Sequence, residues 1–158
     1  MEAVIVRPDA TDIEAAARIG GEAWTPVFEC FRAQLGDELF EACIGSDWKA
    51  RKIDAVRQEM AREESYVTKV DGKVVAFISF RVTGKYAEIL GNAVSPEHQG
   101  KGYGTAQYRF VLNRMREEGA EYVSVTTGGD EGHAPARRAY EAVGFKAFTP
   151  SRTYRMKL

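Results

Sequence analysis

The chain has 158 residues, of which 44% are hydrophobic and 28% charged, and its formal net charge is −1. This composition is typical of a soluble globular protein, and the length predicts one domain over residues 1–158. The charge balance argues against a nucleic-acid partner. The lack of a signal segment, and of an apolar run of about 20 residues, argues against secretion and a membrane partner. With two cysteines, two histidines and no close ligand spacing, we expect reduced thiols, no metal and a cytoplasmic location.

The N-terminal part of the sequence predicts one short strand followed by helices. Thr11, with Glu14 three residues later, has the pattern of a capping box, so a helix is expected to begin there and to end near Gly20. A proline follows Thr25, which is typical of a helix start, and Gly36 is expected to interrupt that second helix. The elements expected here are a strand over residues 3–7 and helices that begin near Thr11, Thr25 and Ser46 or Asp47.

The second part of the sequence predicts a mixed α/β sheet. The dipeptide Asp71-Gly72, between two apolar runs, is a strong hairpin signal. A glycine-rich stretch follows the third strand of the resulting meander and opens a helix. The elements expected here are strands over residues 65–70, 73–82, 85–94, 122–126 and 152–158, and helices over residues 106–118 and 135–144.

The glycine-rich stretch between the strand ending at Val94 and the following helix has the arrangement of a phosphate-binding loop. Glycines let the backbone turn tightly and approach a ligand closely, and the free N–H groups of a helix start attract anions. Two common motifs do not fit: no Gly-Lys-Ser/Thr follows a four-residue spacer, and Gly-x-Gly-x-x-Gly lacks its third glycine. A tight turn without a ligand is the alternative.

The hexapeptide Gln99-Gly100-Lys101-Gly102-Tyr103-Gly104 matches the pattern Gln/Arg-x-x-Gly-x-Gly/Ala. It resembles the coenzyme A pyrophosphate loop of the GNAT superfamily of N-acetyltransferases. Residues 136–145, which end in Val-Gly-Phe, resemble that family's helix after the fifth strand, and the order of elements is similar over the whole chain. The resemblance implies a single acetyltransferase domain over residues 1–158. Its fold is then of the α+β type within the α/β class: a GNAT-like mixed, mostly antiparallel sheet with splayed central strands, flanked by helices.

The resemblance also implies the cofactor and the residues that bind it. Acetyl-CoA is the expected co-substrate, with backbone N–H groups of the loop on its pyrophosphate and its arm between the splayed strands. His133 stands where many family members have an asparagine that helps to hold coenzyme A. The expected cofactor-binding residues are Ala93, Val94, Gln99, Gly100, Lys101, Gly102, Tyr103, Gly104, Thr105 and His133.

Two residues are candidates for proton transfer. Glu88 occupies the strand position at which some family members place a catalytic glutamate, which would take the proton from the amine. The alternative is a surface glutamate paired across strands. Tyr140 matches the family's tyrosine that donates a proton to the leaving sulfur, which a phenol with a pKa near 10 can do at neutral pH. The alternative is a core tyrosine on an amphipathic helix.

These observations predict an N-acetyltransferase that acetylates a primary amine of a small molecule or protein, the alternative being a non-catalytic acyl-CoA-binding regulatory module on the same fold. The acidic residues of the segment 29–47 are either a surface that attracts a cationic amine or a solvated helix face. Trp24, Phe28 and Phe31 line the acceptor pocket or pack in the core. A homodimer through the C-terminal strand or the helices is compatible with the fold.

Overall fold

A computed structural model describes residues 3–158. Within them, one sheet has the strand order β1-β2-β3-β4-β5 and is antiparallel except for the parallel pair β4 and β5. The strands are β1 (Ala3–Val6), β2 (Glu64–Val70), β3 (Lys73–Thr83), β4 (Tyr86–Val94) and β5 (Tyr122–Val125). The helices are α1 (Ala10–Ala23), α2 (Thr25–Cys43), α3 (Trp48–Arg62), α4 (Tyr103–Glu117) and α5 (Ala134–Ala142), with short 3₁₀ turns η1 (Pro96–His98) and η2 (Glu131–His133). This arrangement confirms the expected fold class.

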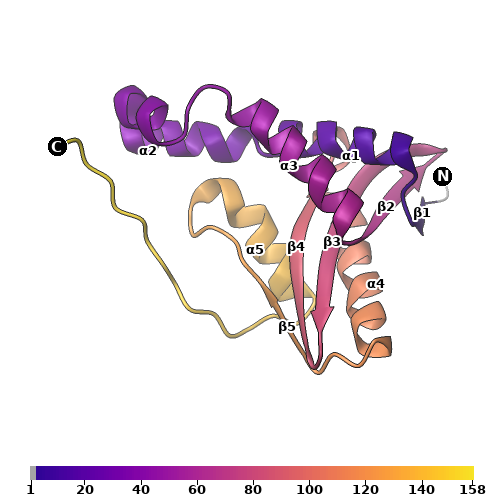
Figure 1. Cartoon of the computed structure of the whole chain (residues 1–158). Helices are drawn as coiled ribbons and strands as arrows, with labels where there is room; N and C mark the ends of the chain where they lie inside the picture. Colours follow the sequence, from indigo (N-terminus) through magenta and orange to yellow (C-terminus); the bar gives the residue numbers. More distant parts are fainter. Residues whose placement is uncertain (1–2) are drawn as a thin grey trace.

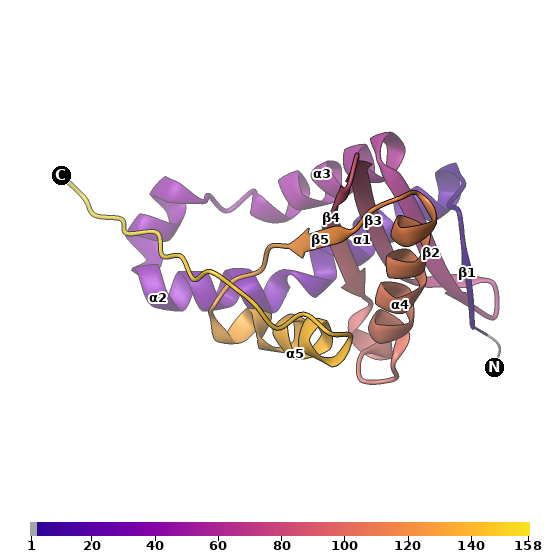
Figure 2. The same ribbon diagram turned by 90° about the horizontal axis from the view of Figure 1, so that it is seen from below.

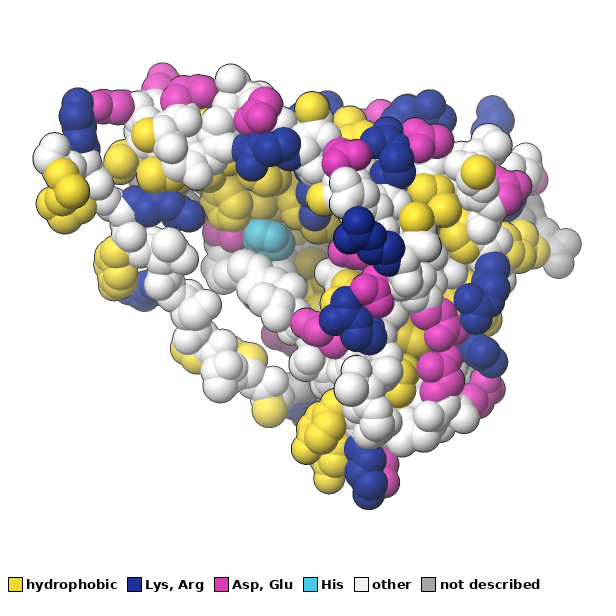
Figure 3. Space-filling view, viewed as in Figure 1, with side chains coloured by type: hydrophobic (Ala, Val, Ile, Leu, Met, Phe, Trp, Pro, Cys, Tyr) yellow, Lys and Arg dark blue, Asp and Glu magenta, His cyan; other side chains and the backbone are white. Residues whose placement is uncertain are grey.

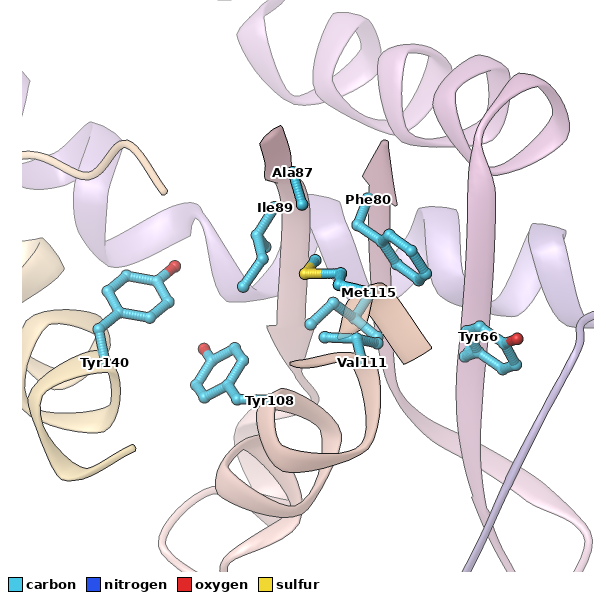
Figure 4. Packing of buried hydrophobic residues seen from close by; sticks show 9 residues of the cluster. Tyr66, Phe80, Ala87, Ile89, Tyr108, Val111, Met115 and Tyr140 are labelled. Atoms are coloured by element: carbon cyan, nitrogen blue, oxygen red, sulfur yellow. The ribbon is translucent and has the colours of Figure 1, made fainter. Parts of the chain in front are cut away.

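The sheet is covered on both faces (Figure 1). Helices α1 and α3 pack on one face, whereas α4 packs on the other, in front of the strands in Figure 2, with α5 beside α4. The side chains of β3 point to both faces of the sheet. Phe77 packs in the core cluster with α1, and Phe80 packs in the core cluster with α4. Figure 4 shows Phe80 and Ile89 packed toward Val111 and Met115 of α4. Both faces of the strand are therefore apolar, as its sequence is.

Strands β4 and β5 separate along their length. Their last parallel pair joins Ile89 to Val125, and beyond it residues 90–94 of β4 remain paired only with β3. The β3–β4 ladder pairs Phe80 with Ile89 and then Ser79 with Gly91, so a bulge skips one residue of β4. A bulge re-aims the side chains that follow it. The expected splay is thus present.

Both boundaries of α1 differ from the sequence expectation, and α4 begins at Tyr103, three residues earlier than expected. The cap of α1 is Asp9, whose side chain accepts a hydrogen bond from the Asp12 N–H (2.9 Å) while the Asp12 side chain accepts one from the Asp9 N–H (3.1 Å). This reciprocal pair takes the place of the predicted box at Thr11. Gly20 does not end the helix, because Val56 of α3 packs against its Cα and the helix continues to Ala23. The break predicted at Gly36 is confirmed by its φ of 77°.

The strand expected over residues 152–158 is wrong. After α5 the chain runs extended and exposed to the C-terminus (Figure 1). Near its end, Lys157 forms an ion pair with Glu38 of α2. A strand requires a neighbour that completes its backbone hydrogen bonds, and no strand within residues 3–158 pairs with this segment. Among the same residues, no helix has both the length and the apolar character needed to cross a membrane.

Candidate functional site

A cavity of about 810 Å³ lies where β4 and β5 separate. Its walls come from the end of β4, the loop before α4, the start of α4, the residues after β5, the start of α5 and the junction of α1 with α2. Figure 3 shows the molecular surface hollowed below α2, with hydrophobic side chains visible in the hollow. The cavity thus combines an apolar interior with free strand backbone along one side.

The glycine-rich loop borders this cavity and adopts a conformation that requires glycine. Gly100 and Gly102 have φ values of +74° and +85°, and a Cβ built on either would meet no atom within 4 Å. Gly102 is the N-cap of α4, and no side chain caps the helix there. The free N–H groups of the first turn therefore lie at the cavity wall, an arrangement that can bind an anion.

Most of the predicted cofactor-binding residues meet at this cavity. Lys101 is the exception, because its side chain is exposed and does not contribute to the wall. The side-chain amide of Gln99 donates a hydrogen bond to the carbonyl of Val94 (3.1 Å) and so ties the loop to the end of β4. The predicted residues that line the cavity are Ala93, Val94, Gln99, Gly100, Gly102, Tyr103, Gly104, Thr105 and His133.

Tyr140 reaches the cavity from α5 and is the last member of a series of side-chain hydrogen bonds. The Tyr108 hydroxyl donates to Oδ1 of Asn92 (2.6 Å), and Nδ2 of Asn92 donates to the Tyr140 oxygen (2.9 Å). Figure 4 shows the two tyrosines side by side, one on α4 and one on α5. Because the Tyr140 oxygen accepts from Asn92, its own hydrogen is free to be donated to another group in the cavity.

Burial sets the protonation state of these phenols. It raises the pKa of Tyr140 above the ordinary value of 10.0, although the hydrogen bond from Asn92 and the nearby Tyr108 hydroxyl act in the opposite direction. Burial likewise raises the pKa of Tyr108. Both phenols are therefore protonated at neutral and moderately alkaline pH, which is the form that can donate a proton.

Two further polar groups at the cavity lack partners. Gln107 of α4 is fully buried, and neither atom of its side-chain amide has a hydrogen-bond partner within residues 3–158. The hydroxyl of Thr127, just after β5, is also buried without a hydrogen-bond partner within these residues. A buried polar group without a partner is costly, so these groups point to a ligand with amides or hydroxyls of its own. The pantetheine arm of coenzyme A carries both, and the residues present therefore fit it.

His133 lines the cavity at the start of α5. Its Nδ1 lies 2.7 Å from Oδ2 of Asp130, and its backbone N–H also donates to that carboxylate. Burial by itself would raise the pKa of Asp130, but the hydrogen bonds and charge of His133 outweigh it and hold the pKa below its ordinary value. Asp130 is thus ionised, and it fixes the orientation of the imidazole.

The structure does not bring Glu88 to the cavity. The residue lies opposite Arg81 of β3 and Ser124 of β5, where these strands are still paired, and its side chain is exposed in a separate shallow hollow. A closer carboxylate is that of Glu59 on α3, which hydrogen-bonds to the Ser79 hydroxyl and lies against Gly91 of the cavity wall. The sequence did not indicate that Glu59 lies near the cavity, because its distance from Gly91 depends on how α3 crosses the sheet.

The wall formed by α1, α2 and α3 carries a lysine rather than acidic residues. Lys52 places its Nζ 3.7 Å from the ring centroid of Trp24, and both residues line the cavity. Burial lowers the pKa of this amine, and the charge of Glu59 acts in the opposite direction without outweighing it. The acids of the segment 29–47 do not contribute to the cavity wall, and several are in ion pairs with Arg32, Arg51 and Lys157.

Of the three aromatic residues expected to line the acceptor pocket or pack in the core, only Trp24 lines the cavity. Phe28 and Phe31 are half-buried and belong to none of the buried core clusters. Phe28 stacks on Trp48 with a centroid separation of 4.0 Å, and Phe31 packs edge-on against Phe28, so these two rings pack with each other. The cavity residues that sequence analysis did not single out include Lys52, Asn92, Gln107, Tyr108 and Thr127. Only Gln107 gave a possible signal, as a polar residue within the apolar stripe of its helix.

Comparisons with known proteins agree with this geometry. The model of the acetyltransferase (GNAT) family matches residues 28–145. A search of curated proteins finds no match. Solved structures with a similar fold include the PaiA N-acetyltransferase of Thermoplasma acidophilum in complex with coenzyme A (17% identity, 92% of this chain and 91% of that one, TM-score 0.68).

Two others are a ribosomal-protein-alanine N-acetyltransferase of Brucella melitensis and an aminoglycoside N-acetyltransferase, AAC(6')-Iy, in complex with coenzyme A. The first has 16% identity over 98% of this chain and 100% of that one, with a TM-score of 0.64. The second has 13% identity over 69% of this chain and 88% of that one, with a TM-score of 0.54. At these identities the similarity shows the fold.

The conformation of the loop leads to a prediction for ligand affinity. In Gly102→Ala, the positive φ is strained by about 1–2 kcal/mol and the new methyl group occupies the space that an anion needs. We expect the Kd for coenzyme A, measured by calorimetry, to rise about tenfold or more. The matched control is Gly119→Ala, which has a φ of +91° at the far end of α4 and should lose similar thermal stability with an unchanged Kd. Equal affinities in the two variants would contradict the anion site.

Proposed function

The chain belongs to the acetyltransferase (GNAT) family, and from this premise we propose that it moves the acetyl group of acetyl-CoA to a primary amine of a small molecule or protein. The observation that carries the proposal is the Tyr140 hydroxyl, which lies at the cavity with its hydrogen free because Asn92 already donates to its oxygen. The loop before α4 binds the pyrophosphate through its N–H groups.

The separated strands provide the rest of the cofactor site. The pantetheine arm lies beside residues 90–94 of β4, where the backbone has no partner on the β5 side. Gln107 and Thr127 hydrogen-bond to its amides and hydroxyl, which removes two buried unpaired groups. When bound, acetyl-CoA supplies a thioester whose carbonyl carbon is attacked by the amine, so that a C–N bond forms as the C–S bond breaks.

Proton transfer to the sulfur is the role we assign to Tyr140. Tyr140 would donate the free hydrogen of its hydroxyl to the leaving sulfur, while the N–H of Asn92 would stabilise the charge that develops on the phenol oxygen. The proton released by the amine nitrogen, as it forms the amide, would then restore the phenol. Tyr108 supports this by holding the other end of the Asn92 amide. The apolar surroundings strengthen each of these hydrogen bonds.

A catalytic role separates this proposal from the regulatory-module alternative, and one assay decides between them. We expect acetyl-CoA to bind in a calorimetric titration and to release free thiol in the presence of some member of a panel of amino acids, polyamines, aminoglycosides and lysine peptides. Binding without amine-dependent thiol release across this panel would favour the module. Absence of binding would contradict both.

The proposed acid is tested by Tyr140→Phe. We expect kcat to fall by about 10²-fold or more, with an unchanged Kd for acetyl-CoA, because the proton donor is lost and the ring remains. Since burial raises the pKa of Tyr140, the wild-type enzyme should show no loss of kcat with rising pH until above 10.0. The exposed Tyr122→Phe is the control. A falling limb centred below that pH, or full activity of Tyr140→Phe, would reject the role.

The base role of Glu88 remains a prediction, and its position outside the cavity argues for a small contribution. We expect Glu88→Gln to change kcat/KM by less than about threefold, whereas loss of a working general base costs on the order of 10²-fold or more. Glu59→Gln is the comparison, because that carboxylate lies against the cavity wall. A loss in Glu88→Gln much larger than in Glu59→Gln would restore Glu88 as the base.

The lysine of the acceptor wall favours an amine that also bears an anionic group, such as the carboxylate of an amino acid. We expect Lys52→Met to raise KM for such acceptors about tenfold or more, as loss of a hydrogen bond to a charged group does, and to leave KM for uncharged alkylamines unchanged. Lys49→Met, one turn earlier on α3 and outside the cavity, is the matched control. An equal effect of Lys52→Met on both acceptor classes would contradict this preference.

A further inference from the structure

The connection between β5 and α5 is built around one hydrogen-bonded pair, His133 and Asp130. Nδ1 of His133 lies 2.7 Å from Oδ2 of Asp130, and the His133 backbone N–H donates to Oδ1 of the same carboxylate (3.2 Å). The Arg137 guanidinium donates to the backbone carbonyls of Gly128 (2.7 Å) and Asp130 (2.6 Å). The imidazole, the carboxylate and the backbone that carries them are thus held in one arrangement.

The imidazole of this pair lies directly against the backbone of Gly128. A Cβ at that position would overlap both Nδ1 of His133 and Oδ2 of Asp130. The φ of Gly128 is outside the left-handed region, so glycine is needed here for the close approach and not for an unusual backbone conformation. At Gly129, the next residue, an added Cβ would meet no atom within 4 Å. The need for glycine is therefore specific to the position against which the pair packs.

The charge of Asp130 decides which ring nitrogen of His133 has the hydrogen. Against the effect of burial, His133 holds the pKa of Asp130 below its ordinary value, so the carboxylate is ionised and can only accept. A neutral imidazole then has its hydrogen on Nδ1 and a free electron pair on Nε2. Nε2 has no hydrogen-bond partner within residues 3–158 and is not among the buried unpaired atoms of that range. It is therefore open to the cavity that His133 lines.

His133 stands where the wall formed by α1, α2 and α3 meets α5. A Cβ at Gly132 would lie only 2.9 Å from Cα of Val27, so η2 packs closely on the first turn of α2, just after Trp24 of that wall. On α5, Tyr140 follows His133 by seven residues, about two turns, so both side chains share one face of the helix. Side chains of a helix lean toward its N-terminus, and the Tyr140 ring thus leans toward His133. Figure 3 shows a histidine ring inside the hollow below α2.

We propose that Nε2 of His133 is the general base for the acceptor amine and that Asp130 positions it, a role that rests on the proposed acetyl transfer. An alkylamine is almost wholly protonated at neutral pH, and its nitrogen attacks the thioester only after it has lost one proton. Nε2 takes this proton, directly or through one water, and passes it to solvent. The second proton, released as the amide forms, balances the one that Tyr140 gives to the sulfur.

Other groups at the cavity that can accept a proton lack this arrangement. His98 lies on η1, just before the loop assigned to the pyrophosphate, and Glu131 is exposed. Lys52 is already assigned to an anionic group of the acceptor. Within residues 3–158 neither His98 nor Glu131 forms an ion pair, whereas His133 is paired with Asp130, whose side chain is only 9% exposed.

The base is tested by His133→Ala and its rescue with imidazole. We expect kcat/KM for the amine to fall by about 10²-fold or more with an unchanged Kd for acetyl-CoA, because the base is lost and the cofactor contacts remain. Added imidazole should restore part of the rate, because it enters the space that the side chain leaves. Imidazole should not raise the activity of the control His98→Ala. Full activity of His133→Ala, or a loss that imidazole does not restore, would overturn the proposal.

The two adjacent glycines provide a matched pair of variants. Gly128→Ala leaves every group of the pair in place but pushes the imidazole aside, and it should lose most of the activity that His133→Ala loses. Gly129→Ala adds the same methyl group into open space and should retain full activity. Equal activities of these two variants would contradict a base held against Gly128.

NMR spectra of the ring nitrogens test the pair without turnover. They should place the hydrogen of the neutral His133 ring on Nδ1. A hydrogen on Nε2 would overturn the proposal and leave the proposed acetyl transfer standing. Absence of thiol release by the wild-type chain with every amine tested, although the hydrogen is on Nδ1, would instead reject the proposed function, and the base role with it.

Discussion

The loss of pairing between β4 and β5 beyond Ile89 and Val125 is the constraint on which the rest of the structure depends. Backbone groups that leave a ladder must find other partners, and residues 90–94 of β4 face a cavity on this side. The bulge at Leu90 shifts the register of β4 against β3 by one residue and re-aims Asn92 toward α4 and α5. Strand backbone, an open helix start and a polar side chain are thereby brought to one place, as binding of an extended ligand with a charged end requires.

The chemistry of the site follows from the direction of its hydrogen bonds. Tyr108 donates to Asn92, and Asn92 donates to Tyr140, so the last hydroxyl of the chain has a proton to give and a donor that stabilises the charge left behind. Burial keeps this phenol protonated, because a phenolate is poorly solvated away from water. The same low polarity makes the unpaired amide of Gln107 costly until a ligand fills the cavity.

The features that the sequence predicted correctly are those set by neighbouring residues. The hairpin at Asp71-Gly72 and the glycine loop depend on local backbone geometry, and both are present. The contact of Asn92 with Tyr140 joins residues of β4 and α5 and depends on the bulge, which no spacing reveals. Residues 152–158 have the alternation of a strand, but a strand also needs a neighbouring strand with which to pair. The sequence pattern does not show whether that neighbour is present.

Amide hydrogen exchange with and without coenzyme A tests the central claim, that the cavity between β4 and β5 holds the cofactor, most directly. Saturating coenzyme A should slow exchange in residues 99–105, where the pyrophosphate binds, and in residues 126–127, which line the opposite wall. Exchange in the distant hairpin at residues 71–72 should not change and serves as the internal reference. Protection confined to other parts of the chain, or no protection at saturation, would contradict the claim.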